Sequence, residues 1–368
     1  MEFVISKSEL GALIGKIQNV VPQKAPIPIL SHVLIEAKQG ELIFTATDLT
    51  VGIRCFTKAK VVQEGALSLP SKRFFQLVRE LTDSQIEITA HASEMAEIRA
   101  GTSRFKLNGM NKQDYPTLPN LKEGFKFTIK AQDLKEMLYR TAFAVSREDN
   151  RYVLTGVLMR IQNGKAVFVG TDGKRLAKTE TVVHLTEDFS GEFILPLKAV
   201  EEILKILNDK DEEVTVYLTS DKAAFETSSS LIMTKLLSGD YPDFEQILST
   251  QSEIVLTLHR EELITLLRQI SLFTADSYHS VRFTFEPGEL ILTANTANIG
   301  EGKVSMPVNY EGSKMDIAFN PHFFLDILRH SSDETVNLGI TDSYNPGIIT
   351  DSTASLFILM PMRLNDVE

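Results

Sequence analysis

A short pattern returns at an almost constant step along this chain, and this repeat limits the possible fold more than any other feature. An alternating apolar stretch that ends in an acidic or amide residue occurs three times, at residues 42–48, 166–172 and 290–295. The last residues of these stretches are 124 and then 123 positions apart. A second marker is a proline that recurs with steps of 126 and 125, at Pro70, Pro196 and Pro321. Because independent markers agree, we interpret the chain as one module repeated three times.

The length supports the same division. A chain of 368 residues suits three domains of about 120 residues better than one core. We expect domains at residues 1–122, 125–250 and 253–368. The hydrophobic content of 43% and the charged content of 24% are typical of a soluble globular protein. No apolar run is long enough for a membrane span and the start does not resemble a signal peptide, so we expect a cytoplasmic protein without a membrane partner.

Each module is expected to begin with a strand followed by a helix. Ser6 and Glu9 form a capping-box pattern at the start of the first helix. Apolar residues at helical spacing predict six helices, at 6–20, 71–81, 131–143, 197–208, 260–272 and 321–330. Short alternating stretches separated by Gln-Gly, Asn-Gly and Pro-Gly pairs predict hairpins between the helices. The fold class is therefore α+β, with two helices packed on an antiparallel sheet in each of three tandem copies.

Charge is divided unevenly between the helices and the rest of the chain. The formal net charge is −11, which by itself argues against a nucleic-acid partner. The six predicted helices, however, carry twelve basic and nine acidic residues, so the remainder is strongly acidic. Surface helices often use Lys, Arg and Glu for helix propensity alone. The alternative is that the helices of a closed array share one basic lumen while the acidic remainder faces outward.

The sequence contains no pattern that is typical of catalysis. The P-loop motif is absent, since residues 300–304 lack its first glycine and its hydroxyl residue. The seven histidines do not cluster with carboxylates, and the single cysteine, Cys55, is expected to be a small buried residue, so no metal or cofactor is expected. Asp48 and Asp172 occupy equivalent positions, but in a Thr-Asp turn they are expected to cap backbone groups rather than act as acid and base. We expect a protein that is not an enzyme.

Four motifs identify a known family. They are residues 150–156 (Asn-Arg-Tyr-Val-Leu-Thr-Gly), 169–177 (Val-Gly-Thr-Asp-Gly-Lys-Arg-Leu-Ala), 239–244 (Gly-Asp-Tyr-Pro-Asp-Phe) and 360–364 (Met-Pro-Met-Arg-Leu). Together with the threefold repeat they resemble the bacterial sliding clamps, the β subunit of DNA polymerase III, from Met1 to Leu364. The resemblance implies a head-to-tail homodimer that encircles double-stranded DNA without sequence preference, with helices inside and sheets outside. Twelve helices of about 10–12 Å diameter leave a central hole of roughly 30 Å, which accommodates a duplex.

The resemblance also implies specific site residues. A pocket for short linear peptides of polymerases, repair proteins and the clamp loader is implied at Leu154, Thr171, Gly173, Lys174, Arg175, Leu176, Pro242, Ile247, Tyr344, Pro346, Ile358, Leu359, Met360, Pro361, Met362, Arg363 and Leu364. DNA contacts are implied at Lys24, Arg147, Tyr152 and Lys198. The implied dimer interface comprises Lys72, Arg73, Arg104 and Lys106 against Leu272, Phe273 and Glu301. Arg175 and Arg363 are expected to anchor the peptide.

The chain departs from the family pattern at three places, and two other functions stay open. Lys174 replaces a common histidine, Val153 replaces a frequent aromatic residue, and residues 365–368 extend past the usual Arg-Leu ending. A plain edge strand is the simplest alternative for the terminal apolar run. A repeat scaffold that binds peptides without surrounding DNA is the main alternative function, and an enzyme that uses Asp48 and Asp172 is the third.

Overall fold

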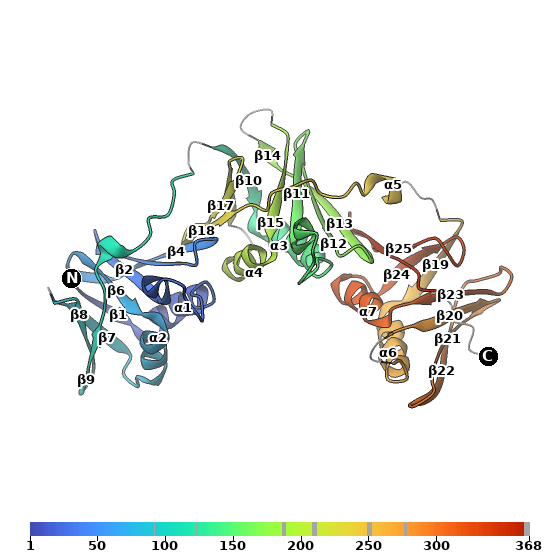
Figure 1. Ribbon diagram of the computed structural model, residues 1–368, viewed down its shortest axis with the longest axis horizontal. Coiled ribbons are helices and arrows are strands. Elements are labelled where there is room, and N and C mark those ends of the chain that lie inside the picture. The colour runs from blue at the N-terminus through green and yellow to red at the C-terminus, as the bar shows by residue number, and fades with distance from the viewer. Residues whose placement is uncertain are drawn as a thin grey trace. The chain divides into compact units, whose positions relative to one another are not determined.

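The computed structural model describes residues 1–91, 93–121, 124–185, 189–207, 212–248, 252–275 and 278–363. Its elements are drawn in Figure 1. The chain divides into two compact units, which are described separately below. The first comprises Met1–Lys135, Val183–Phe189 and Leu195–Leu237, and the second comprises Glu136–Val182, Ser190–Ile194 and Ser238–Glu368.

The first unit contains two antiparallel sheets. A five-stranded sheet has the order β5-β1-β7-β8-β9, and a nine-stranded sheet has the order β14-β10-β16-β17-β18-β4-β3-β2-β6. The strands are β1 (Glu2–Ser6), β2 (His32–Lys38), β3 (Glu41–Thr47), β4 (Val51–Lys58), β5 (Lys60–Gln63), β6 (Gly65–Pro70), β7 (Gln85–Ala90), β8 (Met95–Ala100), β9 (Ser103–Asn108), β10 (Phe125–Lys130), β14 (His184–Leu185), β16 (Glu213–Leu218), β17 (Lys222–Glu226) and β18 (Ser230–Lys235). Its helices are α1 (Lys7–Ile17), α2 (Ser71–Glu80) and α4 (Leu197–Ile206), with short 3-10 turns at Pro28–Ser31 and Lys112–Asp114.

The second unit also contains two antiparallel sheets. An eight-stranded sheet has the order β15-β11-β12-β13-β26-β25-β24-β19, and a four-stranded sheet has the order β22-β21-β20-β23. The strands are β11 (Gly156–Gln162), β12 (Lys165–Thr171), β13 (Arg175–Val182), β15 (Gly191–Pro196), β19 (Ile254–His259), β20 (Val281–Glu286), β21 (Glu289–Thr296), β22 (Gly300–Pro307), β23 (Met315–Phe319), β24 (Thr335–Ile340), β25 (Gly347–Thr350) and β26 (Leu356–Leu359). Its helices are α5 (Glu245–Leu248), α6 (Arg260–Ser271) and α7 (Pro321–His330), with a 3-10 turn at Tyr152–Thr155. It also holds α3 (Ala131–Ala142) from Glu136 onward, whereas residues 131–135 of this helix belong to the first unit.

The predicted helices and turns are confirmed in the described residues. All six helices are present, although α1 is shorter than its predicted range, and Asn208 lies outside the described residues. Ser6 and Glu9 form both hydrogen bonds of the capping box at α1. The hairpin residues Asn163 and Gly164 have φ values of 51° and 70°, as a turn between tightly paired strands requires. Sequence reasoning missed α5, which is too short to show helical periodicity.

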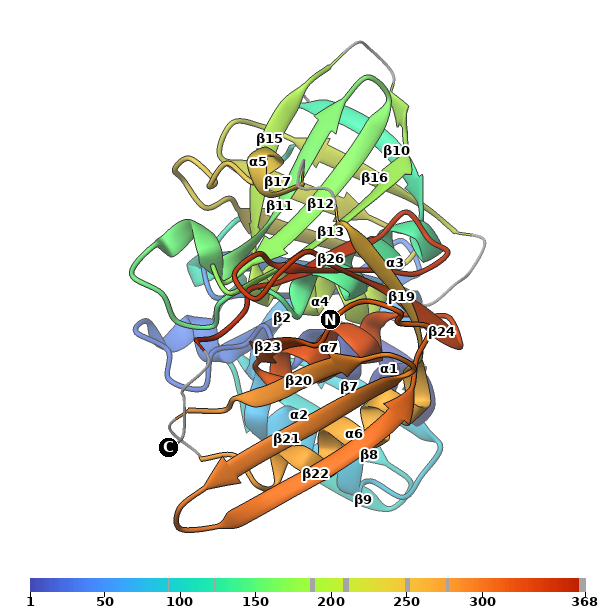
Figure 2. The ribbon, with the colours of Figure 1, turned by 90° about the vertical axis from the view of Figure 1, so that its right-hand side faces the viewer.

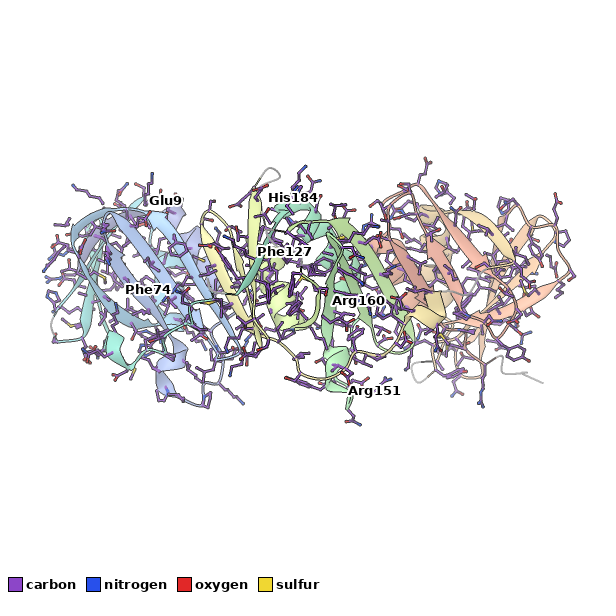
Figure 3. All side chains as sticks on the ribbon, turned by 90° about the horizontal axis from the view of Figure 1, so that it is seen from above. Glu9, Phe74, Phe127, Arg151, Arg160 and His184 are labelled. Carbon is purple, nitrogen blue, oxygen red and sulfur yellow. The ribbon has the colours of Figure 1, made fainter. Side chains whose placement is uncertain are left out.

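The helices pack on one face of the sheets through their apolar residues. In the third module α6 contributes Leu263, Leu267 and Ile270 to a core that also contains Phe283 and Phe324. Figure 2 shows α6 behind strands β21 and β22 of the four-stranded sheet. Phe74 and Phe127 lie within the molecule in the same way, whereas Arg151 extends outward (Figure 3). The expected α+β module of helices on antiparallel sheet is therefore confirmed.

The sheets extend across the boundaries between modules. The modules do not each keep a sheet of their own, because strands from neighbouring modules pair. In the first unit β18 pairs with β4, and in the second unit β26 pairs with β13. The terminal apolar run is thus an interior strand between β13 and β25, and the alternative of a plain edge strand is wrong. Such pairs join residues about 180 positions apart, which a local sequence pattern does not reveal.

Candidate functional site

The second unit brings together most residues of the implied peptide site through the pairing of β13 with β26. Arg175 lies opposite Leu359, and Leu176 lies opposite Ile358. The ladder continues for one more step, because the Met360 backbone N–H donates to the Lys174 carbonyl at 2.9 Å. The segment 356–359 is a continuous apolar run of four residues, which suits an interior strand that is buried on both faces. The motifs at 171–176 and 358–362 are therefore adjacent in space.

The predicted pocket residues differ in how far they reach solvent. Buried ones are Leu154, Thr171, Leu176, Ile358 and Leu359, half-buried ones are Arg175, Pro346, Pro361 and Met362, and exposed ones are Gly173, Lys174, Pro242, Ile247, Tyr344, Met360 and Arg363. Leu364 lies outside the described residues. Tyr344 is 86% exposed and Met360 is 39% exposed, which is unusual for large apolar side chains. Exposed apolar groups beside a buried apolar floor are typical of a surface that binds a partner.

A tight turn at residues 171–175 joins β12 to β13. The Asp172 Oδ1 atom accepts hydrogen bonds from the backbone N–H groups of Lys174 and Arg175, at 2.9 and 3.0 Å. Gly173 has a φ of +82°, which favours glycine, and a Cβ there would lie 3.0 Å from the Arg151 guanidinium. In the first unit Asp48 accepts in the same way from Thr50 and Val51. The prediction that both aspartates cap backbone groups is confirmed.

Arg175 is enclosed by its own chain. Its guanidinium donates to the Asp172 and Asp326 carboxylates, at 3.1 and 2.7 Å, and to the Phe143 carbonyl at 2.8 Å. The guanidinium carbon also lies 4.5 Å from the Phe323 ring centroid. The side chain is 10% exposed. These contacts favour a role in fixing the position of β13 relative to α7, rather than the expected direct contact with a peptide.

A second enclosed arginine, which sequence reasoning missed, joins α3 to the end of the chain. Arg140 is 2% exposed and donates to Asp351 at 2.8 Å, to Thr353 at 3.0 Å and to Ser355 at 3.2 Å. Arg140 was counted among the helix charges that would face a lumen, and its burial removes it from that set. The repeat contained a signal for this contact, because Lys16 and Ser230 stand 124 and 125 residues before Arg140 and Ser355. In the first unit Lys16 donates hydrogen bonds to Ser229 and Ser230.

Helices α3 and α7 of the second unit also meet through aromatic groups. The His330 ring of α7 stacks on Phe143, with centroids 4.2 Å apart, and contacts Tyr139 of α3. Its Nδ1 atom lies 2.7 Å from the Asp326 carbonyl. Burial lowers the pKa of His330 below its usual value, which favours the neutral ring. Together with Arg175, which donates both to Asp326 of α7 and to the Phe143 carbonyl, this contact fixes the end of α3 against α7.

The residues implied in DNA contact fall on exposed loops and on α4. Arg147 and Tyr152 line an open hollow of about 690 Å³ in the second unit. Tyr152 is 63% exposed. In the first unit Lys24 is exposed, while the Lys198 ammonium forms an ion pair with the Asp48 carboxylate. The charge of Lys198 is therefore partly compensated, a feature that the sequence did not predict.

The residues implied in a dimer interface lie on or near two strands at sheet edges. Arg104 and Lys106 belong to β9, the outer strand of the five-stranded sheet, and Glu301 belongs to β22, the outer strand of the four-stranded sheet. Lys72 and Arg73 are exposed in the first turn of α2, and Leu272 and Phe273 follow α6, with Leu272 73% exposed. The Arg104 and Arg99 guanidiniums hold the pKa of Glu97 at about 2, so this carboxylate stays charged at neutral pH.

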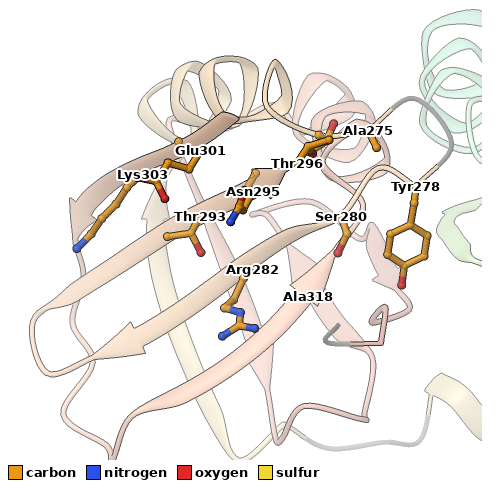
Figure 4. Close-up of a pocket in the computed structure, with 13 residues that line it drawn as sticks. Ala275, Tyr278, Ser280, Arg282, Thr293, Asn295, Thr296, Glu301, Lys303 and Ala318 are labelled. Carbon is orange, nitrogen blue, oxygen red and sulfur yellow. The ribbon is translucent and has the colours of Figure 1, made fainter. Parts of the chain in front are cut away.

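Glu301 also lines a hollow of about 690 Å³ on the face of the four-stranded sheet (Figure 4). Arg282 and Lys303 supply positive charge there, and Thr293 and Asn295 supply neutral polar groups. Among the described residues no group of three or more His, Cys, Asp or Glu side chains is placed to hold a metal ion. Within the same residues, no helix is long and apolar enough to cross a membrane.

Comparisons with known proteins agree with this architecture. The chain matches the N-terminal, central and C-terminal domains of the DNA polymerase III beta subunit over residues 1–119, 128–243 and 245–363. It is 61% identical to the beta sliding clamp of Chlamydia pneumoniae, with both chains covered completely. Two crystal structures resemble it over 99% of this chain and 100% of theirs: a sliding clamp of Pseudomonas aeruginosa bound to griselimycin (27% identity, TM-score 0.94) and the clamp of Bacillus subtilis (26%, 0.94). This chain therefore belongs to the beta sliding clamp family, the beta subunits of DNA polymerase III.

Proposed function

We propose that this protein is a DNA sliding clamp, a non-catalytic accessory subunit that keeps a replicative DNA polymerase on its template. Its three tandem domains are proposed at residues 1–122, 125–250 and 253–368. It acts in the cytoplasm as part of a DNA-directed DNA polymerase complex, and the nucleotidyl transfer belongs to other subunits. The observation that carries the proposal is the pairing rule between modules, which leaves two matching strand edges.

The pairing rule is the same at both junctions. The fourth strand of one module pairs with the last strand of the next, as β4 does with β18 and β13 with β26. The fourth strand of the last module is β22, and the last strand of the first module is β9. Both stand at sheet edges with unpaired backbone groups. Applied to two copies, the rule pairs β22 of each copy with β9 of the other and closes a head-to-tail homodimeric ring.

The register of this contact follows from the repeat. Ile53 lies opposite Ile232 at the first junction, and Ala177 lies opposite Phe357 at the second. Within the modules, Ile53 lies opposite Ala46 and Ala177 lies opposite Gly170, which are equivalent positions of the recurring apolar stretch. In the third module the equivalent residue, Ala294, lies opposite Gly302, so Gly302 is the counterpart of Ile53 and Ala177. The ladders of the last strands likewise make Phe105 the counterpart of Ile232 and Phe357.

The proposed interface therefore places Phe105 of one copy opposite Gly302 of the other. A Cβ at Gly302 would lie 2.9 Å from the Phe273 ring, so the missing side chain leaves Phe273 close to the strand edge. Phe105 is 39% exposed in the single chain and would be covered by this contact. One step further along, Lys106 lies opposite Glu301, which is a favourable charge pair. The other proposed interface residues, Lys72, Arg73, Arg104 and Leu272, surround these pairs.

Double-stranded DNA is the proposed ligand of the ring, bound without sequence preference. The six long helices as observed carry the twelve basic and nine acidic residues of the prediction, while the whole chain has a net charge of −11. Basic side chains on one class of element suit contacts with phosphates, which carry no sequence information. Lys24, Arg147, Tyr152 and Lys198 are proposed to touch DNA. Arg140 is buried and is not expected to contact DNA, and the charge of Lys198 is partly compensated by Asp48. We therefore expect weak contacts with phosphates, which suit sliding.

Polymerases, repair proteins and the clamp loader are proposed to dock by short linear peptides on the β13–β26 surface of the second unit. Leu176 and Ile358 form its floor, and Met360 and Tyr344 offer exposed apolar groups. An unbranched methionine adapts to different peptides. The clamp of Pseudomonas aeruginosa that was crystallised with griselimycin is a relative of similar fold with a bound ligand. Lys174 and Val153 depart from the family pattern, so we expect this chain to prefer a different peptide sequence from its relatives.

Two measurements test the ring. The solution mass is expected to be about twice 41.1 kDa. After loading, the protein should remain on closed circular DNA and leave the same DNA once it is linearised, because a topological link is lost only over free ends. Equal loss from both forms would reject the ring and favour a peptide-binding scaffold that never surrounds DNA. A monomer at physiological concentration would reject the pairing of β22 with β9.

A further inference from the structure

The linker that follows the first module is packed like a bound peptide. Residues 117–121 have no regular secondary structure. Leu121 is buried and Leu118 is half-buried, whereas Thr117, Pro119 and Asn120 are exposed. Two apolar side chains three positions apart therefore face the protein, and the residues around them face solvent. This is the pattern of an extended ligand that is held by two anchor side chains.

The surface beneath the linker belongs to the first junction. Leu121 packs in a small apolar cluster with Ala224 and Met233, and Leu118 packs against that cluster. A Cβ on Gly52 would lie only 2.6 Å from Leu118 Cδ2. Leu118 thus fills the space that a side chain at position 52 would need. The linker covers the strands that join the first two modules, β4 and β18.

The repeat makes this covered surface the counterpart of the proposed docking surface. Gly52 lies opposite Met233 at the first junction, just as Leu176 lies opposite Ile358 at the second. The equivalent residues are 124 and 125 positions apart, which is the step of the repeat. The first junction therefore has the same strands and register as the surface proposed for partner peptides, but its own linker lies on it.

The linker after the second module takes a different course. Phe244 stands 126 residues after Leu118, and it is 2% exposed with the Arg160 guanidinium carbon 4.8 Å from its ring centroid. Arg160 also forms an ion pair with Glu245 at 2.7 Å. Arg160 belongs to β11, which β12 and β13 separate from β26. These contacts hold the start of the second linker away from Leu176 and Ile358.

We propose that residues 117–121 are an intramolecular ligand that closes a second, latent peptide-docking surface at the first junction. The ligand class is that of the occupant, an extended peptide with apolar side chains at positions i and i+3. This proposal rests on the proposed function, because it assumes that partner peptides dock on the equivalent, uncovered surface of the second junction. A tethered segment has an effective concentration in the millimolar range, so free peptides do not compete with it in the intact chain.

The test uses the full chain labelled with ¹³C at its methionine methyl groups, which are observed by NMR. Met233 reports on the latent surface and Met360 reports on the second junction. The probe is the acetylated, amidated peptide Thr-Leu-Pro-Asn-Leu. In a Leu118→Ser/Leu121→Ser variant the Met233 signal should shift and saturate with peptide, with an apparent affinity at least about tenfold higher than in the unmodified chain. The matched control is Thr117→Ala, which changes only an exposed residue of the same segment.

The outcomes separate this proposal from the proposed function. A folded variant whose Met233 signal does not respond to peptide overturns the latent surface, whatever Met360 does. A response of Met233 without any response of Met360 supports the latent surface and counts against docking at the second junction. If the double variant does not fold, Leu118→Ala alone, which keeps Leu121, gives the same comparison. An equal response of Met233 in the unmodified chain also rejects the proposal, because the linker would then not be closing the surface.

Discussion

Replacing Arg140 by methionine tests whether the second junction depends on one enclosed charge. The Arg140 side chain is 2% exposed, the Asp351 side chain is 0% exposed, and the two are joined at 2.8 Å. Methionine keeps a long apolar stem in the same space but removes the guanidinium. Asp351 would then retain only hydrogen bonds, from Thr353 and from the Ser332 backbone N–H. A carboxylate enclosed without its cation is the main cost of the change.

The expected loss is about 3 kcal/mol in the free energy of unfolding of the second unit. Removing one partner of a buried ion pair typically costs about 3–5 kcal/mol, because the remaining charge stays desolvated. We place Arg140→Met at the lower end because the hydrogen bonds to Asp351 persist. The loss is not the sum of the lost hydrogen bonds, since the three hydroxyl partners Ser332, Thr353 and Ser355 contribute less than the charge does.

Lys16→Met is the matched control, because Lys16 stands 124 residues earlier on the equivalent helix of the first module. Lys16 donates to the hydroxyls of Ser229 and Ser230 at 3.0 and 3.4 Å, and it has no carboxylate partner in the described residues. Its replacement leaves no buried charge unpaired. We expect a loss of about 1 kcal/mol or less, which is the usual contribution of such hydrogen bonds.

Urea unfolding combined with amide hydrogen exchange measures the two variants. A chain of two compact units need not unfold in one step, so exchange in α3 and β26 is the local readout. Acid adds a second criterion. Burial alone would raise the pKa of Asp351, but hydrogen bonds from Thr353 and Arg140 leave it below its usual value. The stabilisation from ionised Asp351 is therefore complete above about pH 4 and is lost as the pH falls below that.

The difference in the free energy of unfolding between the unmodified chain and Arg140→Met should therefore become smaller below about pH 4. In that range the unmodified chain loses the stabilisation from ionised Asp351. The difference for Lys16→Met should not change in that range, since no carboxylate is involved. Equal losses for the two variants at pH 7 would refute the reasoning. So would a loss for Arg140→Met that stays constant as the pH is lowered.

Three further changes test the proposed surfaces. Lys106→Glu should weaken the dimer by at least about tenfold in sedimentation, and Glu301→Lys on the same chain should restore most of the affinity, because the pair is reversed and not removed. If a lysine introduced at an unrelated position restored the dimer affinity equally well, the proposed pairing of Lys106 with Glu301 would be wrong. Leu176→Ala with Met362→Ala should weaken peptide binding in calorimetry by about 2–4 kcal/mol combined, as for buried interface residues; unchanged affinity would move the site elsewhere. Gly173→Ala should lower the melting temperature modestly, corresponding to about 1 kcal/mol, because an alanine at a φ of +82° is strained. A melting temperature that does not fall would show that the turn adapts.

Local features were readable from the sequence because they depend on neighbouring residues. The capping box of Ser6 and Glu9, the buried state of Cys55 and the backbone-capping role of Asp172 need only a few adjacent positions. The helices also follow from local apolar spacing. The same holds for the turn at Gly164. Each of these predictions is confirmed for the described residues.

The junctions were not readable in the same way. The pairing of β13 with β26 places Leu176 opposite Ile358, although the two residues are far apart in the sequence. The apolar run of β26 would fit several partner strands, so its sequence does not specify β13. Arg140 and Arg175 look like ordinary surface cations on helix and strand, because the sequence does not show the acceptors that surround them. The resemblance to the sliding clamps located Arg175 at the site, but its three acceptors became visible only in the fold.

The repeat explains why the junctions differ in use while keeping one geometry. Each module has an edge at its fourth strand that needs a partner, and the last strand of the next module supplies it at both junctions within the chain. The register fixes which residues lie opposite each other at each junction. The junctions therefore differ mainly in the segment that covers the paired strands. At Gly52 the missing side chain admits Leu118 of the linker. At the second junction Leu176 stands at the position equivalent to Gly52, and the linker is held by Arg160 instead. In the proposed dimer, the edges of β22 and β9 are paired in the same way by a second copy of the chain.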